Sequence, residues 1–272
     1  MVEHMADYGN NFVQLHNHTH YSLLDGASKI PDLAKRAAEL GITDHGNMHG
    51  ACEMYTNCVA NGVKPIIGIE AYVTPETARQ DKSRVHWGTE AQRRDDVSGG
   101  GLITHLTMWA ENDEGLVNLI KASSVANLEG RVMRYPRMDK EVLATYSKGV
   151  IASSGCPSGI IQTRLRLGQF DEALRAAGEF QDIFGKDNFF IELMDHGLPI
   201  ETQVTGDLLT IAKKLNAPLL ATNDSHYVHA EDAQAQDAML CINSGSRLDD
   251  PDRFKFDGTG YYIKTAEEMR EL

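Results

Sequence analysis

The sequence has few cysteines, no long apolar run and fewer basic than acidic residues. Its four cysteines form no Cys-x-x-Cys pair and are too sparse for a disulfide framework, which favours a reducing setting. No uninterrupted apolar stretch approaches membrane-spanning length, and the polar residues 1–11 lack the apolar core of a secretion signal. We therefore expect a cytoplasmic protein with no membrane partner.

The shortage of positive charge limits how the chain could meet nucleic acid. Lysine and arginine number 26 against 39 acidic residues, a formal net charge of -13. This balance excludes a broad basic surface that coats nucleic acid. It does not exclude a local phosphate site, because bound metal ions invert the electrostatic field around them.

The sequence does contain short apolar, β-rich runs separated by amphipathic segments. Its 272 residues suffice for one large α/β domain or two small ones. Helical spacing of apolar residues occurs around 33–40, 116–123, 174–184 and 208–215. Strands are predicted at residues 12–18, 42–45, 65–73, 102–110, 149–154, 188–194 and 218–224. Alternation of apolar strands with helices predicts parallel pairing, and we favour a barrel-like α/β fold with its site at one mouth.

Two of the predicted strands end in a pair of potential metal ligands. His16 and His18 lie two residues apart and therefore point to the same side of a strand. Asp224 and His226 repeat this arrangement near the other end of the chain. A single His-x-His pair is more often just two polar side chains, but two such pairs favour a divalent cation site.

Further potential ligands follow the other strands, mostly at the C-terminal ends where α/β barrels collect their chemistry. Three of them also have an ordinary structural interpretation: Cys156 as a buried apolar residue, His105 as a core residue and Asp25 as the cap of a turn. The mixture of imidazole, carboxylate and thiol favours zinc, manganese or iron over calcium or magnesium. The candidate metal ligands are His16, His18, Asp25, His45, Glu70, His105, Cys156, Asp224 and His226.

Other residues near these candidates are expected to have other roles. Asp44 is expected to orient His45 or to accept a hydrogen bond in a turn. The remaining cysteines, Cys52, Cys58 and Cys241, lie in helical patterns and are expected in the core.

Three residues are candidates for substrate binding. Asp195 and His196 end the predicted strand 188–194, where they could contact substrate or remain solvated. Arg84 lies in the polar segment 79–101, which is predicted to be a long surface loop. This loop either contacts substrate or is simply solvated and mobile.

The motifs that carry these residues resemble those of the PHP domain family, in particular the N-terminal PHP domains of bacterial C-family replicative polymerases of the DNA polymerase III alpha type. The resemblance runs from residue 12 to about residue 271, and the motifs occur in family order. They are Leu15-His16-Asn17-His18-Thr19, Tyr21-Ser22-Leu23-Leu24-Asp25-Gly26, Thr43-Asp44-His45-Gly46, Gly68-Ile69-Glu70-Ala71-Tyr72, Thr104-His105-Leu106, Ser154-Gly155-Cys156 and Thr222-Asn223-Asp224-Ser225-His226.

The resemblance implies a distorted seven-stranded β/α barrel that holds three divalent metal ions, with zinc expected and manganese or iron as alternatives. One ion would be held by His16, His18, Glu70 and Asp224. A second would be held by Asp25, His45 and His226. Glu70 would also join His105 and Cys156 on a third. The residues expected to be catalytic are Asp25, His45, Glu70 and Asp224.

The activity that the resemblance implies is metal-dependent 3′–5′ exonuclease action, or proofreading, on a single-stranded or frayed DNA 3′ end. Partners would be the remaining polymerase domains and the replisome. Residues 1–11 would be an N-terminal arm, 12–248 the PHP domain, and 249–272 a segment leading toward a polymerase palm. Two alternatives remain: a catalytically weak structural module that binds metal, and a free-standing phosphatase of the histidinol-phosphatase type.

The sequence departs from the family pattern before His45. Relatives have several apolar residues ahead of the Thr-Asp-His-Gly motif, which form the second strand, whereas here Gly41 is followed directly by Ile42 and Thr43. Either this strand is truncated or residues are missing between Gly41 and Ile42. We favour missing residues, because the ligand itself is intact.

Overall fold

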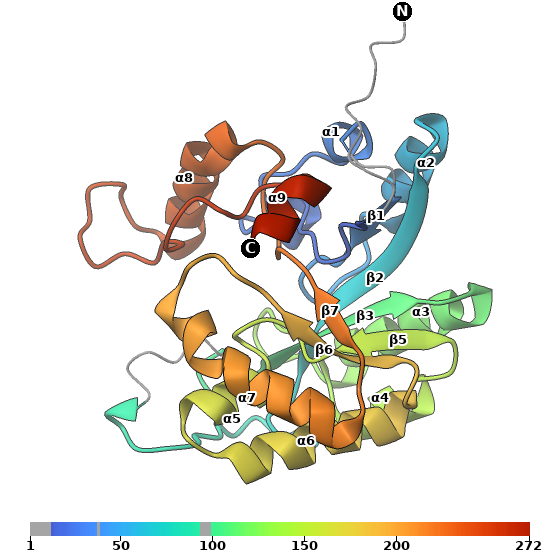
Figure 1. Cartoon of the computed structure of the whole chain (residues 1–272), viewed down its shortest axis with the longest axis vertical. Helices are drawn as coiled ribbons and strands as arrows, with labels where there is room; N and C mark the ends of the chain where they lie inside the picture. The colour runs from blue at the N-terminus through green and yellow to red at the C-terminus, as the bar shows by residue number, and fades with distance from the viewer. Residues whose placement is uncertain (1–11, 37–38, 93–98) are drawn as a thin grey trace, which may run out of the picture. The chain divides into compact units, whose positions relative to one another are not determined.

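The computed structural model describes residues 12–36, 39–92 and 99–272, which form two compact units (Figure 1). Unit 1 combines the N-terminal part up to residue 67 with residues 222–272, and unit 2 comprises residues 68–221. The N-terminal arm predicted at residues 1–11 lies outside the described residues. No helix in the described ranges combines the length and the apolar character needed to cross a bilayer.

Unit 1 is built on a parallel pairing between β1 (Glu39–Ile42) and the start of β2 (Lys64–Val73), which are connected through α2 (Ala51–Ala60). Three further helices belong to it: α1 (Ile30–Ala34), α8 (Ala233–Ser244) and α9 (Ala266–Glu271). A capping box of Thr265 and Glu268 starts α9. The core contains Ile30, Leu33, Leu40, Ile42, Met54, Cys58, Val63, Val228 and Ile263.

Only the start of the helix predicted over residues 33–40 is confirmed, because α1 ends at Ala34. The chain enters β1 at Glu39, and Leu40 is fully buried there by pairing with β2. Gly41 and Ile42 lie within this strand. A strand before His45 is thus present and begins three residues earlier than expected, and residues missing between Gly41 and Ile42 stay a prediction.

The regular strand predicted over residues 12–18 is also wrong. In that segment the chain makes isolated bridges, from Gln14 to Leu40 and from Asn17 to Ser225. The Asn17 side chain donates to the carbonyls of Gln14 (2.8 Å) and Gly41 (3.1 Å), beside a main-chain bond from the Gly41 N–H to the Gln14 carbonyl (2.7 Å). The segment is thus fixed between two others without forming a ladder.

Unit 2 contains the rest of β2 and five further strands, with helices packed on the strands around β5 and β6 (Figure 1). Its strands are β3 (Thr104–Ala110), β4 (Arg137–Met138), β5 (Val150–Ser153), β6 (Phe189–Leu193) and β7 (Leu219–Ala221). Its helices are α3 (Asp113–Glu129), α4 (Lys140–Thr145), α5 (Ile160–Arg166), α6 (Phe170–Phe184) and α7 (Pro199–Leu215).

Strand direction in unit 2 corrects the expectation of parallel pairing. Strand β3 runs antiparallel to both β2 and β5, whereas β5, β6 and β7 are parallel to one another. Parallel neighbours need a crossover connection that is usually helical, and the described residues between β2 and β3 contain no α-helix. The chain accordingly re-enters the sheet in the opposite direction.

Among the described residues, seven strands are hydrogen-bonded in the order β1-β2-β3-β5-β6-β7, with β4 paired to β2. The predicted α/β class with seven strands is confirmed, although β4 takes the place of the segment 12–18. The predicted helices around 116–123, 174–184 and 208–215 are confirmed as α3, α6 and α7. Of the cysteines expected in the core, Cys58 and Cys241 are buried, but Cys52 is exposed.

Candidate metal centre

Two segments far apart in the sequence bring the paired ligands of unit 1 together. The His18 N–H donates to the Ser225 carbonyl (2.7 Å), and the Ser225 N–H donates to the His16 carbonyl (3.0 Å). Residues 16–18 therefore run beside residues 223–226. The His-x-His pair and the Asp-x-His pair, recognised separately in the sequence, adjoin in space.

Asp224 lies at the centre of this cluster. Its Oδ1 atom is 3.0 Å from His18 Nε2, 3.3 Å from His16 Nε2 and 3.7 Å from His226 Nδ1. Both His16 and His18 are completely buried. Asp224 has a φ of 43°, in the left-handed region that non-glycine residues rarely occupy, and such strain concentrates at functional sites.

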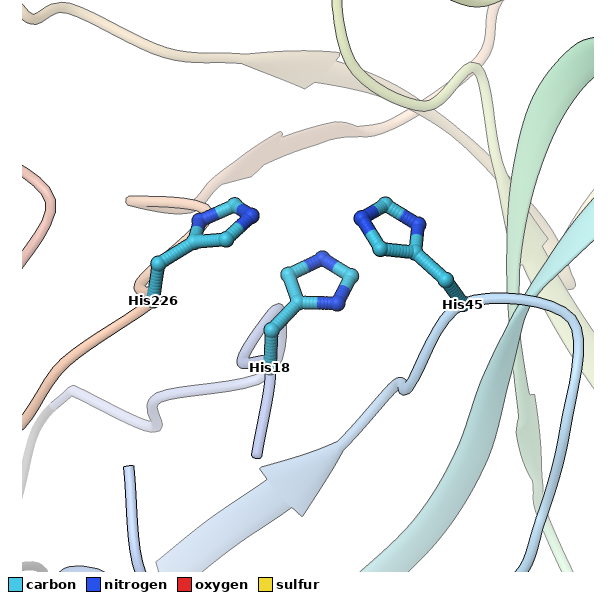
Figure 2. Close-up of side chains that lie close together, drawn as sticks. All are labelled: His18, His45 and His226. Carbon is cyan, nitrogen blue, oxygen red and sulfur yellow. The ribbon is translucent and has the colours of Figure 1, made fainter. Parts of the chain in front are cut away.

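The remaining ligands of unit 1 lie on the other side of His18. The ring of His18 lies between those of His45 and His226, with centroids 4.1 and 4.4 Å away, as Figure 2 shows. His45 Nε2 is 3.0 Å from Asp25 Oδ2. One ring nitrogen from each of the three histidines lies within 4.8 Å of the others. Zinc binds imidazole at about 2.0–2.1 Å, so these nitrogens are near the spacing that a single ion needs.

Burial and neighbouring charges set the protonation states of this cluster. Burial, together with nearby His45 and His226, lowers the pKa of His18 to about 3, so this imidazole is neutral at pH 7. Burial alone would raise the pKa of Asp224, but the surrounding imidazoles outweigh it and hold that pKa well below its ordinary value. Burial is likewise outweighed at Asp25, where the hydrogen bond with His45 lowers the pKa. Neutral imidazole and ionised carboxylate are the forms that bind metal.

Hydrogen bonds to the outer nitrogens determine where the imidazole lone pairs lie. Ser22 Oγ donates to Asp44 Oδ1 (2.6 Å) and so accepts from His18 Nδ1 (3.0 Å), which leaves the lone pair on His18 Nε2. That nitrogen faces the ionised carboxylate of Asp224. His226 Nδ1 donates to the main-chain carbonyl of Asp224 (2.7 Å), which leaves its lone pair on Nε2. Electron-rich atoms that face one another require a cation, so this donor set fits a divalent metal.

Unit 2 contains a smaller group of potential ligands. Glu70 on β2 and His105 on β3 are diagonal neighbours across the antiparallel pair and therefore share a face of the sheet. Cys156 follows β5 after a turn in which Gly155 has a φ of 75°. Glu70 Oε1 lies 3.1 Å from His105 Nδ1 and 3.2 Å from Cys156 Sγ. This combination of carboxylate, imidazole and thiol is of the kind that binds zinc.

Comparison with known proteins identifies the family. A family model described as the PHP domain matches residues 14–196, more than half of the chain. The chain belongs to the PHP domain family. The resemblance predicted from the motifs is therefore confirmed.

Curated relatives of this PHP domain are DNA polymerase III alpha subunits. Those of Mycobacterium tuberculosis and Saccharopolyspora erythraea are 54% and 55% identical, over 97% and 96% of this chain. That of Thermus aquaticus is 43% identical over 96% of this chain. Matches cover 23%, 23% and 21% of these proteins, so the PHP domain spans less than a quarter of their length.

Two solved structures show a more distant similarity to this PHP domain. A proposed metal-dependent phosphoesterase from Bifidobacterium adolescentis is 17% identical, with a TM-score of 0.43 over 79% of this chain and 87% of that one. An amidohydrolase from Chromobacterium violaceum is 14% identical, with a TM-score of 0.46 over the same shares. Similarity at this level says nothing about the chemistry of this PHP domain.

The residues predicted to bind substrate lie outside the two ligand groups. Asp195 is exposed and accepts a main-chain hydrogen bond within its own turn (2.8 Å). Arg84 is exposed and donates to the Gly100 carbonyl (2.6 Å). The His196 side chain is buried, with Nδ1 2.6 Å from Glu201 Oε1. These contacts favour a structural role for His196 and leave Asp195 and Arg84 as predictions.

The loop that carries Arg84 is anchored at both of its ends. The buried Arg137 guanidinium donates to the carbonyls of Arg79 (2.8 Å), Asp81 (2.7 Å) and Leu102 (3.3 Å). The ends of the loop are therefore held in place, while most of its described residues are exposed to solvent.

Sequence reasoning missed the residues that orient the ligands of this PHP domain. Ser22 holds His18, and Thr19 donates to Asp44 through both its N–H (2.7 Å) and its hydroxyl (2.8 Å). Asp44 was expected to orient His45 or to accept a hydrogen bond in a turn. It accepts hydrogen bonds from Thr19 in a turn, and through Ser22 it orients His18. The available signal was the presence of two small hydroxyl residues, Thr19 and Ser22, between the candidate ligands His18 and Asp25.

A second missed residue is Glu192 on β6. It is fully buried, accepts a hydrogen bond from Ser153, and its N–H donates to Ser154 Oγ (2.9 Å). An acidic residue within the apolar run Phe-Phe-Ile-Glu-Leu was the signal that could have found it.

Proposed function

We propose that this chain is the phosphoesterase domain of a bacterial replicative DNA polymerase and that it acts as a metal-dependent 3′–5′ exonuclease in proofreading. The observation that carries the proposal is the convergence of imidazoles, of which His18 is held neutral, and ionised carboxylates around Asp224 and Asp25. Membership of the PHP family and similarity to DNA polymerase III alpha subunits support the polymerase setting.

The proposed metal ligands are nine residues, and three divalent ions are expected, with zinc ahead of manganese or iron. In unit 1 they are His16, His18, Asp25, His45, Asp224 and His226. In unit 2 they are Glu70, His105 and Cys156. Those proposed to be catalytic are Asp25, His45, Glu70 and Asp224.

Bound divalent ions would supply Lewis acidity at the scissile phosphate and would make a water molecule acidic enough to serve as nucleophile near neutral pH. The chain's own residues hold the required charge state. Asp25 and Asp224 stay ionised under the influence of neighbouring imidazoles, and burial keeps His18 neutral. With a pKa of about 3, His18 cannot donate a proton to the leaving 3′-oxygen at pH 7.

The proposed substrate is a single-stranded or frayed DNA 3′ end, and the proposed partners are the rest of the polymerase and the replisome in the cytoplasm. A net charge of -13 opposes long-range attraction of DNA. The grip on DNA must therefore come from bound cations, from local basic side chains or from other domains.

Incubation of the 272-residue chain with 5′-labelled single-stranded DNA tests the proposal. We expect products shortened stepwise from the 3′ end, and their loss in Asp25→Asn and Asp224→Asn. Asp207→Asn is a matched control, because this aspartate is exposed on α7 outside either ligand group. Bound metal is measured in parallel.

The two alternatives predict other results from the same samples. A structural module would bind metal stoichiometrically and leave DNA intact. A free-standing phosphatase would release phosphate from histidinol phosphate and leave DNA intact. Either result would contradict the exonuclease proposal for this chain.

A further inference from the structure

Aromatic rings from the segment after α8 lie against the ligand cluster of unit 1. The ring of Phe256 packs edge-on against that of His226, with centroids 4.7 Å apart, and lies 4.7 Å from the ring of Tyr261. Phe254 packs at right angles to Phe256 at 6.2 Å and is 58% exposed. A series of rings therefore leads from a proposed metal ligand to solvent.

Hydrogen bonds on both sides hold the segment that carries these aromatic rings in place. The Arg253 guanidinium donates through both terminal nitrogens to Asp237 on α8 (2.5 and 2.6 Å). On the other side, the His226 N–H donates to the Tyr261 carbonyl (2.8 Å). Phe254 is thus presented by an anchored segment.

Basic and aromatic residues alternate in the run Arg253-Phe254-Lys255-Phe256. Lys255 is exposed between the two phenylalanines. Proteins that bind single-stranded nucleic acid combine a cationic contact to the backbone with an aromatic ring on which a base stacks. In a chain with a net charge of -13, this local combination beside the ligand cluster is complementary to a nucleotide.

We propose that Phe254, supported by Phe256, is the stacking surface for the 3′-terminal base of single-stranded DNA, and that Lys255 contacts the adjoining phosphate. The inference rests on the proposed function, because it names how the substrate of that centre is positioned. Stacking depends little on base identity, which suits an enzyme that must accept any terminal nucleotide. A docking surface for another protein segment would also expose a phenylalanine, but it would not require a terminal base.

Binding of oligonucleotides to the 272-residue chain tests this inference. The probes are 5′-fluorescent oligonucleotides whose last linkage is a phosphorothioate that resists hydrolysis, with the terminal nucleotide either intact or abasic. Anisotropy should show roughly tenfold tighter binding of the intact end, since stacking of one base on an aromatic ring contributes on that order. An oligonucleotide with an internal abasic position should bind like the intact one.

Variants at two exposed aromatic positions test whether Phe254 is the residue responsible for the preference for an intact end. Phe254→Ala should bind the intact and terminally abasic probes with equal affinity, and Phe254→Trp should restore the preference. Tyr55→Ala is the matched control, because Tyr55 is a similarly exposed aromatic residue (59%) on α2, and it should keep the wild-type preference.

Two results would overturn the inference: no preference in the wild type, or a preserved preference in Phe254→Ala, whether or not both probes bind more weakly. The last result would indicate a docking surface or a purely structural ring. Failure of the proposed function gives a different result. A chain that is not an exonuclease would leave ordinary DNA uncut but would still bind the intact end more tightly than the abasic one.

Discussion

At the scale of single residues, the chemistry of the centre depends on which nitrogen of each imidazole carries a proton. Asp44 accepts from Ser22, and Ser22 in turn accepts from His18 Nδ1. The lone pair is thereby placed on the nitrogen that faces Asp224. Residues that bind no metal themselves thus decide whether His18 can be a ligand.

Removal of this hydroxyl by Ser22→Ala should weaken metal binding about 10- to 100-fold, because the His18 ring loses the partner that fixes its tautomer and orientation. Competition with a chelator measures the affinity. Ser124→Ala is the control, since Ser124 bonds only within its own helix, to the Ile120 carbonyl (2.8 Å). Unchanged affinity in Ser22→Ala would remove Ser22 from this role.

At the scale of elements, the ligand segment 16–18 depends on how closely β1 approaches it. The Gly41 N–H donates to the Gln14 carbonyl (2.7 Å), and a Cβ on Gly41 would lie 2.4 Å from the Leu15 carbonyl oxygen. Any side chain at this position would therefore push β1 away from the ligand segment.

Gly41→Ala is expected to lower the free energy of unfolding by roughly 1–3 kcal/mol, as overpacking does elsewhere. Urea unfolding of the metal-free chain measures the change. Gly206→Ala is the control: Gly206 lies within α7 with open space around it, so alanine should stabilise by up to about 1 kcal/mol. Equal stability of Gly41→Ala and the wild type would contradict the close approach.

Two helices of unit 2, α5 and α6, are joined through Glu76. Its carboxylate pairs with Arg164 of α5 (2.5 Å) and Arg175 of α6 (2.7 Å). Burial would raise the pKa of Glu76, but hydrogen bonds from Arg175 and Arg164 outweigh it and lower that pKa. The stabilisation is therefore complete above the ordinary pKa of 4.5 and is lost as pH falls through the lowered value.

Glu76→Gln should accordingly be less stable than the wild type at pH 7, by roughly 1–2 kcal/mol, and this difference should shrink as the pH is lowered to about 3. Thermal unfolding of both proteins across this pH range gives the comparison. Glu114→Gln, which removes an exposed pair with Lys148, should change stability little at any pH. A pH-independent difference for Glu76→Gln would show that packing, not charge, is responsible.

At the scale of the whole molecule, an acidic chain with ionised carboxylates among its proposed ligands is expected to be stabilised by divalent cations. A ligand that binds only the folded state stabilises it by about 2.7 kcal/mol at a free concentration 100 times its dissociation constant. Stoichiometric zinc should therefore raise the unfolding temperature, and a chelator should reverse the rise. An Asp25→Asn, Asp224→Asn double variant should lose most of the effect. An equal rise in that variant would mean that the metal binds elsewhere.

Local sequence patterns predicted a large part of this fold. Apolar runs located β2, β3, β5 and β6, and periodic spacing located α3, α6 and α7. The failures occurred where tertiary contacts override local preference. The segment 12–18 makes isolated bridges to two other segments instead of a ladder, and Leu40 is drawn from a helical pattern into pairing with β2.

The sequence by itself determined the chemical types of the candidate ligands, the family and the α/β class. The donor atoms of each side chain and the spacing of apolar residues follow directly from the order of residue types. Only the tertiary structure decided that β3 is antiparallel, that Ser22 orients His18, and that Phe256 packs against His226 with Phe254 next to it. These features depend on contacts between residues far apart in the chain or on the path of a connection. Neither is encoded in the local spacing of residue types.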